Sequence, residues 1–279
     1  MKPAPRIRQK PVDAEPVQTG PSRPHRPSDL LSWALTLINR PDRASLLAEL
    51  EDLLVAGRGF SLATMNLDHL VKLRRQPEFR AAYAAHSHVV ADGRPVVWMR
   101  GLAGRPVSLV PGSELVAPLA QIAARRGIPV GFLGTTDGAL ATAAERLATA
   151  CPGLDVVARV APPMGLDPEG ADADAALDEL AAAGARLVLV SLGAPKQERL
   201  VARAARRMPD VGFASVGAGI DFVAGTQRRA PRWMRRLALE WLWRLLDDPK
   251  RLAGRYAACA AILPGLAVAS LRLRGRRPG

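Results

Sequence analysis

The chain has 279 residues, with 39 Lys and Arg against 26 Asp and Glu, and therefore a net charge of +13. Residues 1–28 carry +4 and residues 228–279 carry +10, so the body between them is nearly neutral at −1. This segregation disfavours a uniformly basic nucleic-acid coat, and 48% hydrophobic residues exclude collagen-like and wholly disordered chains. Cys151 and Cys259 lie too far apart to indicate a disulfide framework or a zinc cluster, and they suit a reducing cytoplasm.

Residues 1–28 form a basic segment with seven prolines and no apolar run. We expect a disordered tail, and we expect the protein to stay in the cytosol because the apolar core of a secretory signal is missing. After the tail we place an α/β domain over residues 29–227. Residues 228–279 form a basic helical appendage.

Apolar residues recur at helical spacing from Leu30 onward and are interrupted at Pro41, which predicts two short helices. A strand at 60–66, one helix at 67–86 and a strand ending at Asp92 follow. The same alternation then repeats, with strands at 128–136, 154–162, 186–193 and from 211, and helices at 137–151, 172–185 and 194–208. A loop is expected after the strand that starts at 211. Continuous apolar strands separated by helices predict a mostly parallel sheet covered on both faces.

Parallel sheets of this kind bind ligands at the carboxyl ends of their strands. The strand ends here are residues 64–66, 91–93, 134–138, 193–198 and 217–221. The glycine-containing turn at 134–138 offers backbone N–H groups to a phosphate, although the same residues are also ordinary turn formers. Neither the dinucleotide fingerprint nor the P-loop pattern is present.

Asp92 is the strongest candidate for a functional carboxylate among these strand ends, because it follows an apolar strand and precedes Gly93. It suits an acid or base at the rim of a cleft, and it equally suits an Asx turn or a helix cap. Lys196, Gln197 and Glu198 have the same two interpretations. They suit a hydroxyl-rich ligand, and with Pro195 they also form an ordinary helix start.

We assign no metal and no cofactor. His86 and His88 have no acidic or cysteine partner nearby in sequence, so we expect half-exposed histidines at a helix end. Asp172 and Asp174 match a short D-x-D pattern, but acidic residues are also favoured at the start of a helix by its dipole.

The C-terminal region combines arginines and tryptophans at helical spacing. Arg232, Arg236, Glu240 and Arg244 share one face, and Trp233, Leu237, Trp241 and Leu245 form the adjacent stripe. Residues 256–271 are apolar but too short for a comfortable membrane span of about 20 residues, and basic residues flank them. We favour a helix that lies on an anionic membrane surface over a core helix whose arginines are solvated. We also favour it over a helix that spans the membrane.

The chain closely resembles the WecG/TagA/CpsF family of bacterial glycosyltransferases in the stretches TMNLDHL, HVVADGRPVVW, GFLGTTDG, LVSLGAPKQE and GAGIDFVAGTQRRAPRWMRRLALEWLWRLL. GAPKQE and the RRAPRWM run are the most specific. The similarity extends from about Ser61 to Tyr256, so that the tail and the final apolar segment lie outside it.

The resemblance implies a Rossmann-like fold and an inverting transfer that does not depend on a chelated metal. The sugar, of the N-acetylmannosamine, N-acetylmannosaminuronic acid or glucose type, comes from a nucleoside-diphosphate donor, expected to be UDP-linked. The acceptor is a sugar carried on polyprenyl pyrophosphate at the cytoplasmic face of the bacterial inner membrane. Such enzymes serve teichoic acid, capsule or exopolysaccharide synthesis.

The resemblance also assigns roles to residues. Asp92 matches the general base, which takes a proton from the acceptor hydroxyl. Thr64 and Asn66 match a strand end beside the base and the donor, and Lys196, Gln197 and Glu198 match a loop lining the same cleft. The arginines expected to hold the diphosphate, because without a metal some cation must stabilise the leaving group, are Arg229, Arg232 and Arg235.

Two other function classes remain as alternatives. A nucleic-acid-binding protein would use the basic ends, but the neutral body and the lack of a recognisable binding motif disfavour it. A nucleotide-dependent Rossmann enzyme of another class, such as an oxidoreductase, lacks the phosphate fingerprint. The donor, the acceptor, the linkage and a possible homo-oligomer stay open.

Overall fold

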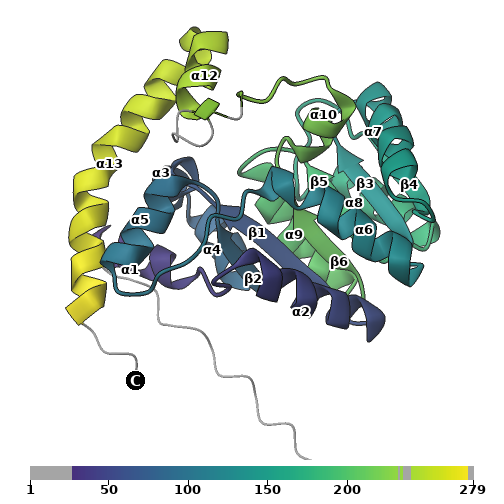
Figure 1. Ribbon diagram of the computed structural model, residues 1–279, viewed down its shortest axis with the longest axis horizontal. Helices are drawn as coiled ribbons and strands as arrows, with labels where there is room; N and C mark the ends of the chain where they lie inside the picture. Colours follow the sequence, from purple (N-terminus) through teal and green to yellow (C-terminus); the bar gives the residue numbers. More distant parts are fainter. Residues whose placement is uncertain (1–26, 232, 235–239, 276–279) are drawn as a thin grey trace, which may run out of the picture.

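Six parallel strands form one sheet in the order β2-β1-β6-β5-β3-β4 (Figure 1). The computed structural model describes residues 27–231, 233–234 and 240–275, so the predicted tail lies almost entirely outside the described residues. The strands are β1 (Phe60–Met65), β2 (His88–Ala91), β3 (Val130–Gly134), β4 (Val156–Val160), β5 (Leu187–Ser191) and β6 (Gly212–Ser215). The predicted α/β, Rossmann-like fold is confirmed.

Helices connect the strands and cover both faces of the sheet. They are α1 (Pro27–Thr36), α2 (Arg43–Val55), α3 (Leu67–Arg75), α4 (Pro77–Ala85), α5 (Arg94–Leu102), the 3-10 turn η1 (Gly112–Glu114), α6 (Val116–Arg126), α7 (Asp137–Ala150), α8 (Ala171–Ala182), α9 (Lys196–Arg207), α10 (Gly219–Ala224), α12 (Glu240–Asp247) and α13 (Pro249–Gly275). The helices α5 and α6 fill the stretch between the second and third strands, which the sequence pattern left unassigned.

The core lies on both sides of the sheet, because successive strand residues point to opposite faces. Leu62 of β1 packs with α2, α6, α7 and α10. Its neighbour Ala63 packs on the other face, with α1, α3, α4, α5 and α13. Further along that second face, Val188 of β5 packs with α8 and α9. The apolar runs of the strands are therefore buried on both faces of the sheet, as expected for parallel strands.

Two predicted elements differ from the structure. The single helix expected at 67–86 is two helices, α3 and α4, that meet at Gln76. Pro77 explains the break, because proline lacks an N–H group and holds the preceding residue in an extended conformation. Residues after β6, expected to form a loop, contain the short helix α10.

Helix α13 is longer than the apolar segment that predicted it and runs along one side of the molecule (Figure 1). Five of its buried residues belong to the hydrophobic cluster formed with α1, α3 and α5, and they are Cys259, Ile262, Leu266, Ala269 and Leu273. The segment Leu252–Gly275 is long and apolar enough to cross a membrane, with 33% of its apolar window buried, but core helices of soluble proteins meet the same test. One face of α13 is therefore part of the protein core.

The connections create crevices at the carboxyl edge of the sheet. Strand β3 leads through α7 outward to β4, whereas its neighbour β5 leads through α9 on the opposite face to β6. Strands β1 and β6 are also neighbours whose following helices lie on opposite faces. Such switch points are where open α/β sheets bind ligands.

Candidate active site

Asp92 follows β2 at this carboxyl edge, and its side chain is partly exposed. Its backbone N–H donates to the carbonyl oxygen of Met65 at 2.8 Å, which fixes the residue against the end of β1. The hydroxyl of Thr64, itself buried, donates to Asp92 Oδ2 at 3.4 Å. The cap of helix α5 is Gly93, with a φ of 128°, so Asp92 is not its N-cap residue. Thr64 and Asp92 therefore lie side by side at the ends of β1 and β2, and their roles stay a prediction.

Asn66 lies beside these two residues and begins helix α3. Its Oδ1 accepts a hydrogen bond from the backbone N–H of His69 at 3.1 Å, the interaction expected of an N-cap. A Cβ atom added at Gly93 would lie 3.7 Å from the Cβ of Asn66, so the two strand ends are in contact. Asn66 is therefore held beside Gly93, the residue that follows Asp92.

Two buried aromatic side chains, Tyr83 and His69, contact each other next to the end of β1. The hydroxyl of Tyr83 donates to the carbonyl oxygen of Thr64 at 3.0 Å and lies 2.6 Å from Nδ1 of His69. Burial lowers the pKa of His69 to about 3, so the ring is neutral near physiological pH. Thr64 is thus positioned by its backbone as well as by Asp92.

Gln197 and Glu198, in the first turn of α9, are buried, with exposed fractions of 2% and 0%. Gln197 Oε1 accepts hydrogen bonds from the backbone N–H groups of Gly217 at 3.2 Å and Leu192 at 3.4 Å. Its Nε2 donates to Glu198 Oε1 at 3.2 Å. Burial raises the pKa of Glu198 to about 7, and Glu198 Oε2 has no hydrogen-bond partner among the described residues. This pair joins the residues that follow β5 to those that follow β6.

Lys196 is the first residue of α9 and is partly exposed, unlike its two buried neighbours. Gly193, which precedes it by three residues, has a φ of 73°, a conformation that glycine adopts without strain. The loop after β5 therefore leaves Lys196 accessible at the same edge of the sheet.

The loop after β3 is held to α10 through a side-chain contact. The Thr135 hydroxyl lies 2.5 Å from Asp221 Oδ1, and Thr226 also donates to that oxygen at 3.2 Å. Thr135 has a φ of 49°, which is uncommon for a residue with a branched side chain. Thr136 caps α7 by accepting from the N–H of Ala139. The turn therefore has one strained residue at the switch point between β3 and β5.

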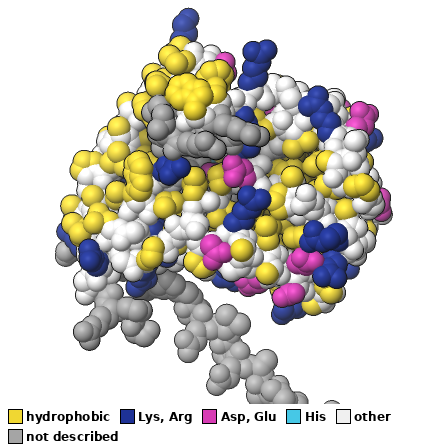
Figure 2. Space-filling model, in the orientation of Figure 1, with side chains coloured by type: hydrophobic (Ala, Val, Ile, Leu, Met, Phe, Trp, Pro, Cys, Tyr) yellow, Lys and Arg dark blue, Asp and Glu magenta, His cyan; other side chains and the backbone are white. Residues whose placement is uncertain are grey.

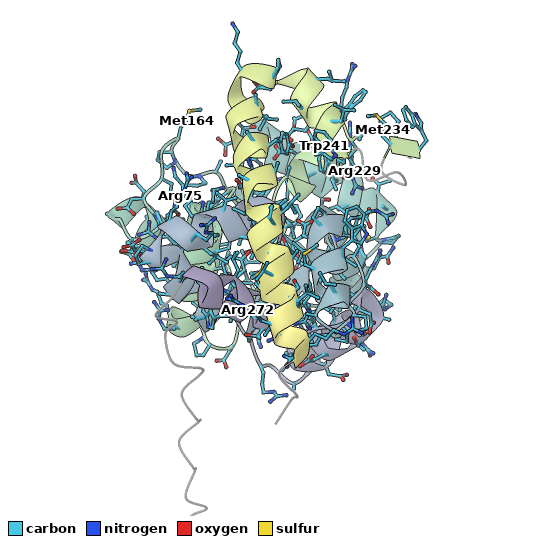
Figure 3. The ribbon with its side chains drawn as sticks, turned by 90° about the vertical axis from the view of Figure 1, so that its left-hand side faces the viewer. Arg75, Met164, Arg229, Met234, Trp241 and Arg272 are labelled. Carbon is cyan, nitrogen blue, oxygen red and sulfur yellow. The ribbon has the colours of Figure 1, made fainter. Side chains whose placement is uncertain are left out.

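Arg229 follows α10 and reaches back to the loop between α5 and α6. Its Nη2 donates to Ser113 Oγ at 3.1 Å and to Glu114 Oε1 at 3.2 Å. Arg232 and Arg235, which were predicted to act with Arg229, lie outside the described residues. Figure 3 shows Arg229 and Trp241 near the same upper end of the molecule, with α13 in front.

His86, His88 and Asp174, which were also singled out in the sequence, have structural partners. His86 and His88 are buried rather than half-exposed, which corrects that prediction. His86 Nδ1 lies 2.7 Å from the Ala82 carbonyl oxygen and His88 Nε2 lies 3.3 Å from Glu49. Asp174 lies in the first turn of α8, and its carboxylate pairs with Arg203 and Arg207 of α9. In the described part of the chain, no group of three or more His, Cys, Asp and Glu side chains is arranged to hold a metal.

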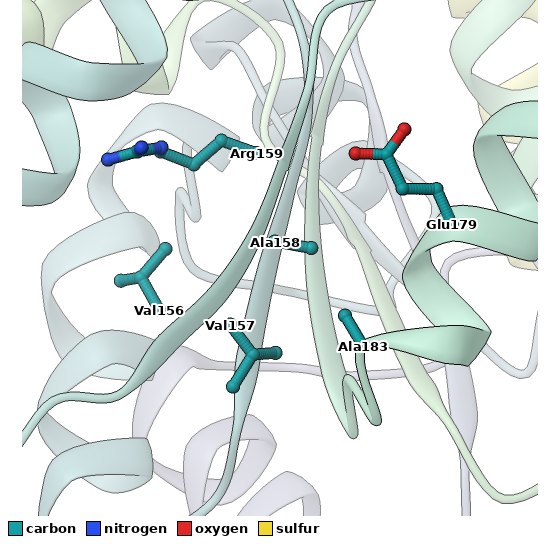
Figure 4. A pocket seen from close by; sticks show the side chains of 6 residues that line it. All are labelled: Val156, Val157, Ala158, Arg159, Glu179 and Ala183. Atoms are coloured by element: carbon teal, nitrogen blue, oxygen red, sulfur yellow. The ribbon is translucent and has the colours of Figure 1, made fainter.

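A pocket elsewhere in the molecule lies beside β4, at the opposite edge of the sheet from β2 (Figure 4). It is lined by Val156, Val157, Ala158, Arg159, Glu179 and Ala183. None of these residues belongs to the predicted site. The pocket is therefore separate from the strand ends around Asp92.

Sequence reasoning missed the loop of residues 111–114, which contacts both Thr64 and Arg229. Pro111 and Gly112 form a pair that is common in turns, so the sequence did not distinguish this loop from any other. The loop reaches the site only because the chain folds back over the end of the sheet.

A comparison with known families shows which family the chain is related to. The model of the glycosyl transferase WecG/TagA/CpsF family matches residues 33–277. The match includes the final apolar segment, which corrects the expectation that the similarity ends near Tyr256. Members of this family are glycosyltransferases of cell-surface polysaccharide synthesis. The chain belongs to the WecG/TagA/CpsF glycosyltransferase family.

Proposed function

We propose that this protein is an inverting glycosyltransferase that works without a chelated metal. It moves a sugar of the N-acetylmannosamine, N-acetylmannosaminuronic acid or glucose type from a UDP-linked donor. The acceptor is a sugar carried on polyprenyl pyrophosphate, and the enzyme works at the cytoplasmic face of the membrane.

The observation that carries this proposal is the meeting of Thr64, Asn66 and Asp92 at the carboxyl ends of β1 and β2. Asp92 is partly exposed, so an acceptor hydroxyl can reach its carboxylate. A carboxylate held at such a place acts as the general base, taking the proton as the hydroxyl oxygen attacks the anomeric carbon. The nucleoside diphosphate leaves from the opposite face of the sugar, which inverts the configuration.

Cations must neutralise the departing diphosphate, and we assign this role to Lys196 and Arg229 together with Arg232 and Arg235. Lys196 and Arg229 are both partly exposed near the strand ends. Gln197 and Glu198 are buried, and we propose that they act on the donor site without touching the donor. They fix the loops after β5 and β6 and thereby shape the surface that the donor contacts.

We further propose that α13 lies flat on the membrane. Its exposed face between residues 256 and 271 has no charged residue and consists of Ala257, Ala260, Ala261, Pro264, Gly265, Val268 and Leu271. Its opposite face is occupied by the core, and Arg255 forms an ion pair of 2.7 Å with Asp68 of α3. A spanning orientation would break these contacts, whereas an interfacial one preserves them. Figure 2 shows hydrophobic side chains over α12 and along the side where α13 runs.

The experiment that tests the catalytic assignment compares wild-type protein with the Asp92→Asn variant. A panel of nucleotide sugars is offered with a lipid-pyrophosphate-linked sugar, and nucleoside-diphosphate release is measured with and without EDTA. We expect transfer to fall about 10²–10⁴-fold in the variant, with an unchanged melting temperature, because a general base contributes an effect of that size. The Asp52→Asn variant, altered at an exposed carboxylate of α2, should retain full activity.

Full activity of a folded Asp92→Asn protein would refute the role of Asp92. Absence of release by the wild-type protein with every donor would overturn the proposed reaction. Loss of activity with EDTA would overturn the claim that no chelated metal is needed.

A further inference from the structure

The loop of residues 110–114, which precedes α6, contacts the ends of three strands and the start of α10. The N–H of Val110 donates to the carbonyl oxygen of Ala91 at 2.8 Å. A Cβ atom at Gly112 would lie 3.1 Å from both the Ser215 carbonyl oxygen and the Thr64 side chain. The backbone of this loop is therefore wedged between the residues that form the candidate site, and it has little freedom to move.

The next two residues of the loop project toward the C-terminal segment. Ser113 Oγ and Glu114 Oε1 accept hydrogen bonds from Arg229 Nη2 at 3.1 and 3.2 Å. The guanidinium carbon of Arg229 lies 5.3 Å from the centre of the Phe222 ring, within cation–π distance. The Arg229 guanidinium is thus restrained by a hydroxyl, a carboxylate and an aromatic ring.

These restraints leave part of the guanidinium available. Arg229 Nε is buried and has no acceptor among the described residues. The side chain as a whole is 29% exposed, so part of it is open to solvent. A ligand with anionic oxygens can contact this exposed part while Nη2 keeps its contacts with the loop, since guanidinium groups have five N–H donors.

The local charge balance also favours an anion. Glu114 lies 4.0 Å from Arg43 of α2 as well as 3.2 Å from Arg229, so that two arginines share this carboxylate. Glu114 therefore orients Arg229 without cancelling the positive charge of the pair. An arginine side chain that is already ordered loses less conformational entropy when it binds, and this lowers the cost of binding.

We propose that Ser113 and Glu114 are positioning residues that hold Arg229 in place for the diphosphate of the donor. The inference rests on the proposed function, because it takes the nucleoside diphosphate as the ligand of Arg229. It adds two residues outside the sequence-predicted site and connects the C-terminal segment to the loop above β1 and β6.

The test measures UDP binding by calorimetry, and the KM and kcat for the donor, in Glu114→Ala, Glu114→Gln, Ser113→Ala, Arg229→Ala and the double variant Glu114→Ala/Arg229→Ala. We expect Glu114→Ala and Arg229→Ala each to weaken UDP binding about tenfold, with smaller effects of Glu114→Gln and Ser113→Ala. The double variant should bind UDP no more weakly than Arg229→Ala alone, because Glu114 acts through Arg229. This lack of additivity distinguishes positioning from a general loss of stability.

Glu51 provides the matched control, because its carboxylate also bridges two arginines, Arg125 and Arg126, away from the site. Glu51→Ala should leave UDP binding and KM unchanged. If Glu114→Ala does not fold, Ser113→Ala and Glu114→Gln carry the test, since both remove less of the contact.

The outcomes separate this inference from the proposed function. Wild-type protein that binds neither UDP nor another nucleoside diphosphate would overturn both. Wild-type binding of UDP, combined with unchanged affinity in folded Ser113 and Glu114 variants, would overturn the positioning role and leave the function standing. Tighter binding by Glu114→Ala would also overturn it, because Glu114 would then compete with the diphosphate.

Discussion

Glu198 combines a fully buried carboxyl group with a structural task. One of its oxygens accepts from Gln197, whose own amide holds the loops after β5 and β6 together. Burial raises the pKa of Glu198 to about 7, while Lys72 nearby works in the opposite direction. The folded state therefore binds a proton at Glu198 more tightly than the unfolded chain does.

This pKa predicts a specific dependence of stability on pH. Because the folded-state pKa lies above the unfolded value of 4.5, the free energy of unfolding should fall as the pH rises from about 4.5 to about 7 and then level off. Glu198→Gln keeps an oxygen for Gln197 and removes the titration. We expect the variant to gain stability relative to wild type between pH 5 and pH 8, at about 1.4 kcal/mol per pKa unit.

Denaturant unfolding of both proteins at pH 5, 6, 7 and 8 measures this difference. Glu145→Gln, at an exposed position of α7, serves as the control and should follow the wild-type curve. If the Glu198→Gln curve also stays parallel to wild type, Glu198 does not titrate in this range.

Helix α3 depends on Asn66 for its start, and the same residue is a proposed substrate contact. The two roles can be separated, because aspartate is also a good N-cap and alanine is not. Asn66→Ala should lose about 1 kcal/mol of stability and most activity. Asn66→Asp should keep the stability and still lose activity, since a second carboxylate near Asp92 cannot replace the amide.

Denaturant unfolding and donor turnover together measure these effects. Asp42 is the control, since it caps α2 by accepting from the Ser45 N–H at 2.9 Å. Asp42→Ala should cost about 1 kcal/mol and leave turnover unchanged. A fully active Asn66→Asp protein would mean that Asn66 only caps the helix.

Helix α13 has two different faces that its sequence alone does not separate, because almost every residue between 256 and 271 is apolar. Its inward face shares a hydrophobic cluster with α1, and the Ser32 hydroxyl donates to the Ala269 carbonyl oxygen at 3.2 Å. Asp68 connects α3 to α13, because it pairs with Arg255 of α13. Burial alone would raise the pKa of Asp68, but Lys72 and Arg255 lower this pKa below its usual value. The predicted division between a body and an appendage at residue 228 stays a prediction.

At the scale of the whole molecule, basic residues flank the apolar outer face of α13. Arg272 and Arg274 follow the apolar face at one end, and Arg255 lies near the other. Cations beside an apolar surface favour anionic lipids, with about 1 kcal/mol per residue near the surface. The +10 of residues 228–279 therefore has two proposed uses, at the lipid surface and at the diphosphate.

Membrane binding can be tested on the full-length protein. Val268 of α13 is 48% exposed, and a charge there should oppose insertion into the lipid surface without disturbing the core. We expect Val268→Glu to bind vesicles containing phosphatidylglycerol at least tenfold more weakly than wild type in sedimentation assays. Val55→Glu, at a similarly exposed position of α2, should bind as wild type does. Equal binding by all three proteins would argue against α13 as the membrane contact.

The sequence by itself determined the alternation of strands and helices, the parallel sheet and the edge at which Thr64, Asn66 and Asp92 lie. These features depend on local periodicity and on the general geometry of parallel sheets. The single helix expected at 67–86 was wrong because Pro77 interrupts it. The family resemblance rested on short motifs, and the family match confirmed it.

Only the tertiary structure decided which of the polar strand-end residues are buried. Lys196, Gln197 and Glu198 are consecutive and equally polar, yet only Lys196 is accessible, because the first turn of α9 buries the other two and Gln197 bonds to the loops after β5 and β6. Glu114 and Arg229 meet across 115 residues of sequence, and α13 buries one of two equally apolar faces. Such contacts depend on how distant segments pack, which periodicity along the chain does not encode.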